Sequence, residues 1–129
     1  MSKNPAAKKT IARAAPAYSV RGHIWIEGPE GAFLGVGRVA LLENIRDTGS
    51  ITGAAKALKM SYRRAWELVE SMNRQAGAPL VAASTGGRGG GGATLTEAGE
   101  AAIALFMELD GRFSRWRTDE ARKIALIKK

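Results

Sequence analysis

The sequence predicts a mainly α-helical domain with a small β component, and three features support this fold class. Two serines that can cap helices, Ser50 and Ser61, stand eleven residues apart, and apolar residues recur at helical spacing after each. A glycine-rich segment, 84–93, separates two short β-like runs. A long apolar stripe at helical spacing then runs from Ala98 to Trp116. This order is typical of a winged helix-turn-helix: a three-helix core, a β-hairpin wing, an N-terminal strand and a long C-terminal helix.

The amino-acid composition excludes some classes of protein and indicates which kinds of partner to expect. The chain has 129 residues and no cysteine, so disulfides and thiolate metal sites are excluded and a cytoplasmic location is expected. No apolar run is long enough to cross a membrane, and we expect no membrane partner. The net charge of +8 is concentrated near the two ends of the chain. Such basic tails are typical either of phosphate-binding arms or of solvated solubility segments, and both interpretations stay open.

The N-terminal third is expected to hold a tail, a strand and a helix. Residues 1–17 are rich in Lys, Ala and Pro without periodicity, which predicts a disordered basic tail. Residues 18–27 contain β-branched and aromatic types and predict a strand, followed by a turn and a short apolar piece, 32–36. A helix is then expected over 37–48, with Gly49 as its C-terminal stop.

The helix-turn-helix follows, and its second helix is the candidate recognition helix. Ser50 caps a short helix, and Ser61 caps a helix that we expect to end near Ala76, before Gly77. In this motif the N-terminal half of the second helix enters the major groove, while the first helix lies across phosphates. The candidate base-contacting residues are therefore Tyr62, Arg63, Arg64 and Trp66, and the candidate phosphate contacts are Ser50, Thr52 and Lys56.

Each of these assignments has a structural alternative. Arg63 with Glu67, and Arg74 with Glu70, stand at the i,i+4 spacing of ion pairs, which would make an ordinary solvated helix face. Trp66 could pack in the core as readily as contact a groove.

The wing is predicted from a glycine-rich hairpin. Strands are expected at 80–82 and 94–95, with the loop 84–93 as the tip. The loop contains a formal G-x-G-x-x-G match, but it lacks the βαβ setting and the downstream acid of a dinucleotide site. We expect instead a wing tip in which Gly87 and Gly89 let the backbone approach DNA and Arg88 is the inserted cation, the alternative being a merely flexible loop.

Thr96 is expected to cap the last helix, over residues 97–117, before a basic tail at 118–129. The domain thus spans 18–117. A helix this long exceeds what a three-helix core can cover, so we expect it to pack against a partner helix in a homodimer, the alternative being that it wraps its own domain. The dimerisation candidates are Ala102, Leu105, Leu109, Phe113 and Trp116.

The sequence offers no catalytic or metal-binding set. His23 is the only histidine, so neither a triad nor a metal cluster can be assembled, and we expect a protein that is not an enzyme and has no cofactor.

Several runs resemble one family closely. S-Y-x-x-A-W at 61–66, M-N at 72–73 and T-G-G-x-G-G-G-G at 85–92 resemble the N-terminal DNA-binding domain of ModE-family molybdate-dependent transcriptional regulators, themselves related to LysR-type winged helices. The resemblance covers about residues 18–116. It implies a cytoplasmic, nucleoid-associated homodimer that binds double-stranded DNA, with recognition on Ser61, Tyr62, Arg63 and Trp66 and the wing on residues 86–92.

The resemblance also bears on effector sensing. Family members that sense molybdate carry further C-terminal domains, and this chain ends at Lys129, so we expect a regulator without a molybdate-binding domain. Two alternatives stay open. One is a switch that binds molybdate or tungstate at the glycine loop or the dimer interface. The other is a protein-interaction adaptor whose long helix pairs with a separate effector-sensing protein.

Overall fold

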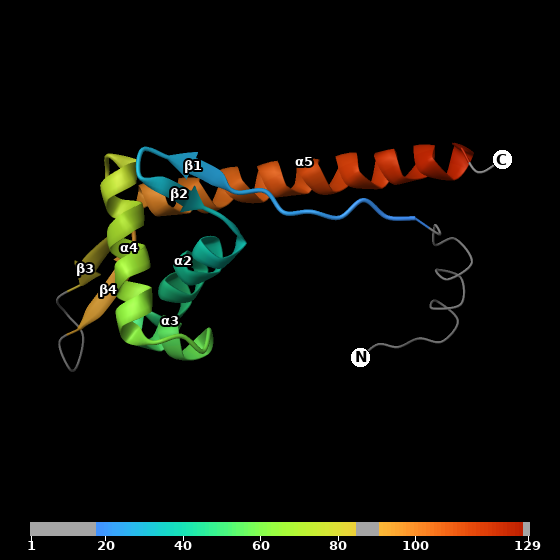
Figure 1. Cartoon of the computed structure of the whole chain (residues 1–129). Helices are drawn as coiled ribbons and strands as arrows, with labels where there is room; N and C mark the ends of the chain where they lie inside the picture. Colours follow the sequence, from blue (N-terminus) through green and yellow to red (C-terminus); the bar gives the residue numbers. More distant parts are fainter. Residues whose placement is uncertain (1–17, 85–90, 128–129) are drawn as a thin grey trace. The chain divides into compact units, whose positions relative to one another are not determined.

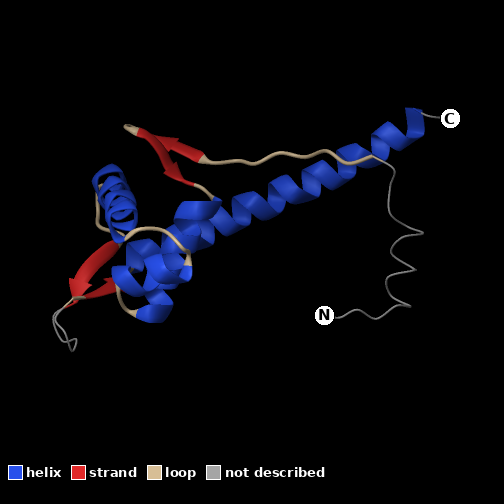
Figure 2. Cartoon of the chain, turned by 60° about the horizontal axis from the view of Figure 1, so that its bottom comes forward, coloured by secondary structure: helices blue, strands red, loops and turns tan. Residues whose placement is uncertain are grey.

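The computed structural model describes residues 18–84 and 91–127 (Figure 1). The chain divides into two compact units, one formed by residues 24–110 and the other by the two flanking stretches. The elements are, in order, β1 (Ile26–Gly28), β2 (Gly31–Leu34), α2 (Val36–Thr48), α3 (Ile51–Ala57), α4 (Tyr62–Ala76), β3 (Val81–Ser84), β4 (Gly92–Leu95) and α5 (Glu97–Ile127). This mainly helical arrangement with two small hairpins confirms the predicted fold class (Figure 2).

The core of the 24–110 unit lies where α2, α3, α4 and the start of α5 meet. Its largest fully buried side chains are Phe106, Leu34, Leu41, Leu42, Ile45 and Met72. The alanines Ala54, Ala55 and Ala65 are also buried, and their small size lets α3 and α4 approach closely. The apolar stripes predicted on these helices therefore face one common core.

The predicted helix caps are confirmed. The Ser50 hydroxyl accepts from the Gly53 amide at 2.8 Å, and the Ser61 hydroxyl accepts from the Arg64 amide at 3.0 Å. Gly49 and Gly77 end α2 and α4 with φ of 80° and 79°, a left-handed conformation that glycine adopts without a Cβ penalty. Local capping rules thus set both boundaries of the helix-turn-helix.

The turn between α3 and α4 contains a strained residue. Lys59 has φ of 57°, the only positive φ of a non-glycine residue in the described part of the chain. The turn is closed by backbone bonds from the Lys59 amide to the Lys56 carbonyl and from the Met60 amide to the Ala55 carbonyl. These two bonds fix the angle at which α4 leaves α3.

The first hairpin is shorter than the sequence suggested. A strand was expected over 18–27, but the ladder covers only Ile26–Gly28, which pairs antiparallel with β2. A strand needs a neighbour for its backbone groups, and β2 ends at Leu34 because α2 begins two residues later. Within the described ranges, residues 18–25 therefore have no strand to pair with.

The second hairpin is the wing. β3 and β4 pair antiparallel, with Val81 opposite Leu95 and Ser84 opposite Gly92. At its base, the Thr96 hydroxyl donates to the Pro79 carbonyl and accepts from the Gly99 amide, so it caps α5 as predicted. The wing-tip candidates Gly87, Arg88 and Gly89 lie outside the described residues, as does the predicted tail 1–17.

The helix α5 is longer than expected. It runs for 31 residues to Ile127, so much of the stretch predicted as a basic tail, 118–129, is helical. Ion pairs at i,i+3 spacing, Asp119 with Arg122 and Glu120 with Lys123, support this extension. Residues 97–110 of the helix belong to the first unit and residues 111–127 to the second. None of the helices in the described ranges is long and apolar enough to cross a bilayer.

In the second unit, residues 18–23 pack against the C-terminal half of α5. An Nη1 atom of Arg117 donates to the Val20 carbonyl at 3.0 Å, and the same guanidinium lies over the Phe113 ring. Phe113 also stacks on Trp116, and Ala121 is buried. Phe113 therefore contacts residues of its own chain.

Candidate nucleic-acid interface

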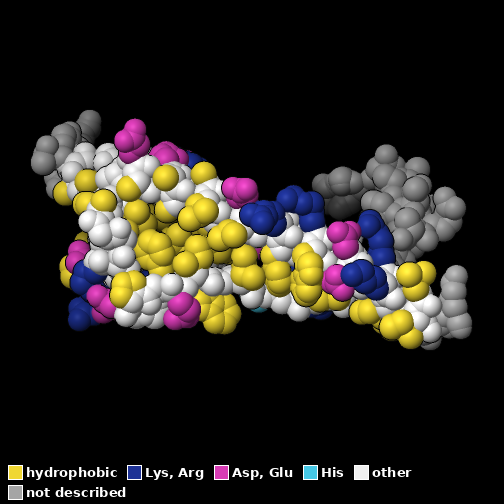
Figure 3. All heavy atoms as spheres, turned by 90° about the horizontal axis from the view of Figure 1, so that it is seen from above, with side chains coloured by type: hydrophobic (Ala, Val, Ile, Leu, Met, Phe, Trp, Pro, Cys, Tyr) yellow, Lys and Arg dark blue, Asp and Glu magenta, His cyan; other side chains and the backbone are white. Residues whose placement is uncertain are grey.

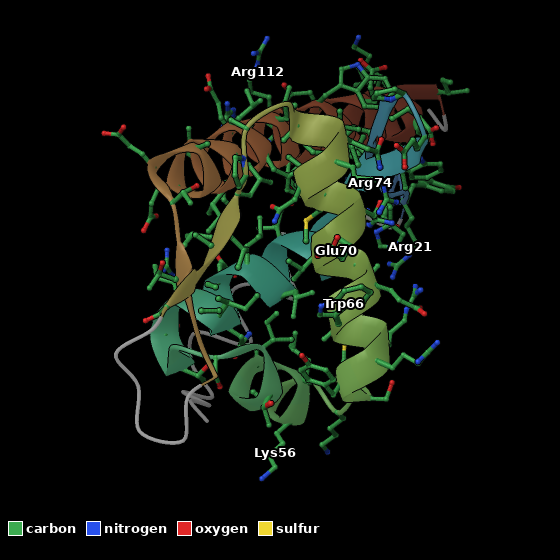
Figure 4. All side chains as sticks on the ribbon, turned by 90° about the vertical axis from the view of Figure 1, so that its left-hand side faces the viewer. Arg21, Lys56, Trp66, Glu70, Arg74 and Arg112 are labelled. Atoms are coloured by element: carbon green, nitrogen blue, oxygen red, sulfur yellow. The ribbon has the colours of Figure 1, made fainter. Side chains whose placement is uncertain are left out.

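The helix α4 packs one face against the core and exposes its other faces to solvent. Ala65, Leu68, Val69 and Met72 are buried, whereas Tyr62 and Trp66 are 54% and 45% exposed. Trp66 is thus not a core residue, which leaves a groove contact open to it. In Figure 4, Trp66, Glu70 and Arg74 follow one another along α4.

A depression of about 750 Å³ lies between α4 and the wing. Tyr62, Trp66, Glu70 and Asn73 line it from α4, Thr52 lines it from α3, and residues 81–84 and 91–93 line it from the wing. The structure therefore brings three predicted contact residues, Thr52, Tyr62 and Trp66, to one surface. A helix-turn-helix binds duplex DNA by inserting its second helix into the major groove, and this surface belongs to that helix and to the wing beside it.

Arg63 lies on the outer face of α4 and forms the predicted i,i+4 ion pair. Its Nε is 3.4 Å from Glu67 Oε2, and both side chains are at least half exposed. A pair this exposed contributes little, so a DNA phosphate or base edge can replace the carboxylate.

The second i,i+4 ion pair considered from the sequence, between Arg74 and Glu70, is wrong. Arg74 pairs with Glu30 in the turn between β1 and β2, at 3.0 Å, and not with Glu70. The hydrogen bond to Glu30, together with its charge, raises the pKa of Arg74 above its ordinary value. The hairpin offers Arg74 a partner that a helical wheel cannot reveal.

The remaining predicted contacts lie at helix starts or on exposed faces. Ser50 and Ser61 use their hydroxyl oxygens as cap acceptors, but each hydroxyl proton is still able to reach a phosphate. Thr52 and Lys56 are exposed on α3, and Lys56 points away from the body of the unit in Figure 4. Arg64 is also exposed, but it leaves α4 toward Arg38 on α2, on a different side from the wing.

Asn73 is a positioning residue that the sequence did not single out. Its side-chain oxygen accepts from the Leu80 amide at 2.8 Å and the Val81 amide at 3.2 Å, and its side-chain nitrogen donates to the Val81 carbonyl at 3.0 Å. The sequence places Asn73 in the M-N pair of the family resemblance but does not indicate this contact. It fixes the wing against the recognition helix.

The dimerisation candidates are divided among different surroundings. In the first unit, Ala102 is buried in the core, Leu109 is half-buried and Leu105 is 52% exposed. In the second unit, Trp116 is 53% exposed. Figure 3 shows hydrophobic side chains gathered over the first part of α5. Leu105 and Met107 are the large apolar residues exposed in residues 97–110 of this helix, and they leave it on different faces.

Comparison with known proteins shows what this part of the chain is similar to. Residues 37–100 match the family described as bacterial regulatory helix-turn-helix protein, lysR family. This match covers α3, α4 and the wing, as well as nearly all of α2 and the start of α5.

The curated relatives are longer proteins. The chain is 51% identical over 76 residues to the molybdenum-pterin-binding protein MopB of Rhodobacter capsulatus, covering 59% of this chain and 28% of MopB. It is 42% identical over 80 residues to the molybdenum transport protein ModE of Azotobacter vinelandii, covering 62% and 30%. It is 44% identical over 69 residues to the DNA-binding transcriptional dual regulator ModE of Escherichia coli, covering 54% and 26%.

Among solved structures, the fold resembles that of full-length LTTR LysG from Corynebacterium glutamicum. The TM-score is 0.50 at 23% identity, over 67% of this chain and 28% of LysG.

Proposed function

We propose that this chain, whose residues 37–100 are a LysR-family helix-turn-helix domain related to ModE regulators, binds specific duplex DNA sequences as a dimer and thereby controls transcription in the cytoplasm. The family match identifies a DNA-binding regulatory domain rather than an enzyme. The observation that carries the proposal is that Tyr62, Arg63 and Trp66 are exposed at the start of α4, where Tyr62 and Trp66 also line the depression beside the wing.

Sequence is read, in this proposal, by the first turns of α4. Arg63 can bind O6 and N7 of guanine with two hydrogen bonds, and the rings of Tyr62 and Trp66 can meet a thymine methyl group. These side chains follow directly after the cap at Ser61, and the N-terminal end of a recognition helix is the end that reaches base edges.

Phosphates are held by the elements around α4. Thr52 and Lys56 are exposed on α3, and the positive end of its helix dipole favours an anion near Ser50. Residues 87–89 at the wing tip, with Arg88, are proposed to reach the adjacent minor groove or its phosphates. These contacts position the protein but do not read sequence.

Two copies associate through α5 in this proposal. Leu105, Leu109 and Trp116 recur at intervals of four and seven residues and are not fully buried. Such spacing is typical of an apolar seam between helices. A two-fold dimer would place two α4 helices on an inverted-repeat site.

Selection of bound duplexes from a random pool, followed by fluorescence anisotropy, tests the function. We expect an inverted repeat to be enriched, and Arg63→Ala to lose about tenfold discrimination, the equivalent of one good base contact. The control is Arg112→Ala on α5, which should keep the selected sequence and the affinity. A wild-type protein that binds no duplex at 50 mM salt would contradict the proposal and favour the adaptor.

A response to molybdate or tungstate is the second candidate, favoured by the names of the relatives MopB and ModE. The glycine-rich loop or the dimer interface would hold the oxyanion. Calorimetric titration of the DNA-free protein with sodium molybdate tests this response. The absence of heat at 1 mM ligand would remove it while leaving the DNA-binding function untouched.

A further inference from the structure

A second depression lies on the opposite flank of α4 from the wing. It measures about 290 Å³, and its lining includes Trp25, Leu34, Met60, Leu68 and two arginines, Arg38 and Arg64. It shares no lining residue with the depression beside the wing. At about 100° per residue, Arg64 and Leu68 leave α4 on the side opposite Tyr62, Trp66 and Asn73. The recognition helix therefore has one depression along each flank.

The two arginines in this depression lack an acidic partner. Within the described ranges no carboxylate lies in ion-pair distance of Arg38 or Arg64, whereas Arg46, Arg63, Arg74 and Arg122 each pair with one. Arg38 Nη1 donates to the Ser71 hydroxyl at 3.1 Å, which fixes its direction. Partial burial, and then the like charge of Arg64, lower the pKa of Arg38. Two cations kept close without a counter-charge are complementary to an anion.

The backbone at the start of α2 adds donors to the same place. Gly35 is the N-cap of this 13-residue helix and supplies no side-chain cap, and the first turn carries no acid. Gly35 and Gly37 line the depression, and a Cβ on Gly37 would meet no atom within 4 Å. Packing thus does not require glycine at 37, but its bare backbone lets an anion approach the amides of the first turn.

From this geometry we infer that Arg38, Arg64 and the first turn of α2 bind one backbone phosphate of duplex DNA, on the edge of the major groove opposite the wing. This inference rests on the proposed function. A helix in the major groove has a phosphate backbone along each edge, because the groove is only about 12 Å wide. The wing and Thr52 contact the phosphates of one edge. Arg38 and Arg64 contact a phosphate of the other edge, so Arg64 binds a phosphate rather than a base.

The depression is placed for such a contact. Its lining runs from Met60, which directly precedes the Ser61 cap, to Leu68 in the middle of α4, so one end of the depression lies at the end of α4 that enters the groove. Arg38 and Arg64 provide its charged part, and the buried side chains of Leu34 and Leu68 form an apolar floor beside them.

The salt dependence of DNA binding tests the inference. Arg38→Gln and Arg64→Gln should each reduce the slope of log K against log[salt] by about 0.9. Between 50 and 200 mM salt, each variant should therefore lose roughly threefold less affinity than wild type. Both should weaken selected and random duplexes alike, whereas a base-reading residue would weaken only the selected one.

Ser71→Ala is the matched control, because it removes the hydrogen bond of Arg38 but keeps its charge. We expect Ser71→Ala to retain the wild-type slope, and circular dichroism melts to show all three variants folded. A second readout uses duplexes with a single methylphosphonate at each position in turn. Wild type should lose affinity at one phosphate on the edge opposite the wing, and Arg38→Gln should be insensitive at that phosphate.

The outcomes separate this inference from the function on which it rests. Wild-type binding to duplex with unchanged slopes in both arginine variants would overturn the phosphate assignment and leave the regulator intact. Unchanged slopes together with calorimetric binding of inorganic phosphate that Arg38→Gln abolishes would assign the pair to a free anion, and would equally overturn it. A wild-type protein that binds no duplex would instead remove the proposed function itself.

Discussion

Asn73 on α4 pairs with Val81 on β3 as a neighbouring strand would. Its side-chain nitrogen donates to the Val81 carbonyl at 3.0 Å, and its side-chain oxygen accepts from the Val81 amide at 3.2 Å. One carboxamide thus satisfies both backbone groups of a strand residue, in a part-buried position where leaving them unpaired is costly. This side chain thereby ties the start of the wing directly to the recognition helix.

Replacing Asn73 by Ala should destabilise the fold by about 2 kcal/mol, because partly buried groups of Leu80 and Val81 lose their partner. Urea denaturation measures the loss. Asn44→Ala is the control, since Asn44 donates only to the Ala40 carbonyl one turn before it in its own helix, and it should cost less than 1 kcal/mol. Equal losses in the two variants would mean that Asn73 has no special role at the wing.

Gly99 permits the close approach of α5 to the wing. A Cβ at this position would collide with the Leu80 carbonyl oxygen and the Leu95 side chain. Gly99→Ala should therefore cost about 1–3 kcal/mol in unfolding free energy, because a backbone atom cannot give way as a flexible side chain can. In the same helix, a Cβ at Gly111 would meet only Arg115 Nη1, at 3.8 Å. Gly111→Ala should stabilise by about 0.5–1 kcal/mol, so chemical denaturation should move the two variants in opposite directions.

Lys59 occupies a left-handed conformation that glycine would adopt more easily. A non-glycine residue in this region costs about 1–2 kcal/mol, and the greater freedom of glycine in the unfolded chain offsets part of the gain. Lys59→Gly should therefore raise stability by up to about 1 kcal/mol in a thermal melt. Lys59→Ala removes the same charge without relieving the strain and should not stabilise. A melting temperature that rises equally in both variants would point to charge instead of strain.

The elements predicted correctly are those specified by residues close together in sequence. Ser50 and Ser61 cap helices through bonds to amides three positions on, and Gly49 and Gly77 end helices through their own φ values. Spacing of apolar residues likewise identified the buried face of α4. These features need no knowledge of the tertiary fold.

The sequence-based predictions failed where a contact with a residue distant in the sequence determines the structure. Arg74 reaches Glu30, which lies 44 positions away, and not the Glu70 on its own helix. The strand at Ile26 is short because β2 limits its ladder, and Asn73 matters because β3 passes beside α4. Arg38 and Arg64 lie on two different helices, so the residue pattern of neither helix alone could indicate that they line one depression.

Glu67 should limit the affinity of α4 for DNA. It forms an ion pair with Arg63 on an exposed face, so it competes with DNA for the guanidinium group that is proposed to read bases. It also places a negative charge near the DNA phosphates. Glu67→Gln should raise duplex affinity several-fold at 50 mM salt, with a smaller gain at 300 mM because salt screens the repulsion. Glu108→Gln, an exposed acid on α5, should leave affinity unchanged. Equal gains in both variants would reflect net charge alone.

Leu105 and Met107 allow a test of the proposed dimer in which exposure is held constant. They are 52% and 54% exposed on α5, but two residues of helix place their side chains about 200° apart. Only Leu105 continues the seam with Leu109 and Trp116. Leu105→Glu should raise the dimer dissociation constant at least tenfold in sedimentation equilibrium, because a charge buried between two helices is costly to desolvate. Met107→Glu should have no effect on association. Dissociation by both variants, or by neither, would exclude this stripe of α5 as the dimer interface.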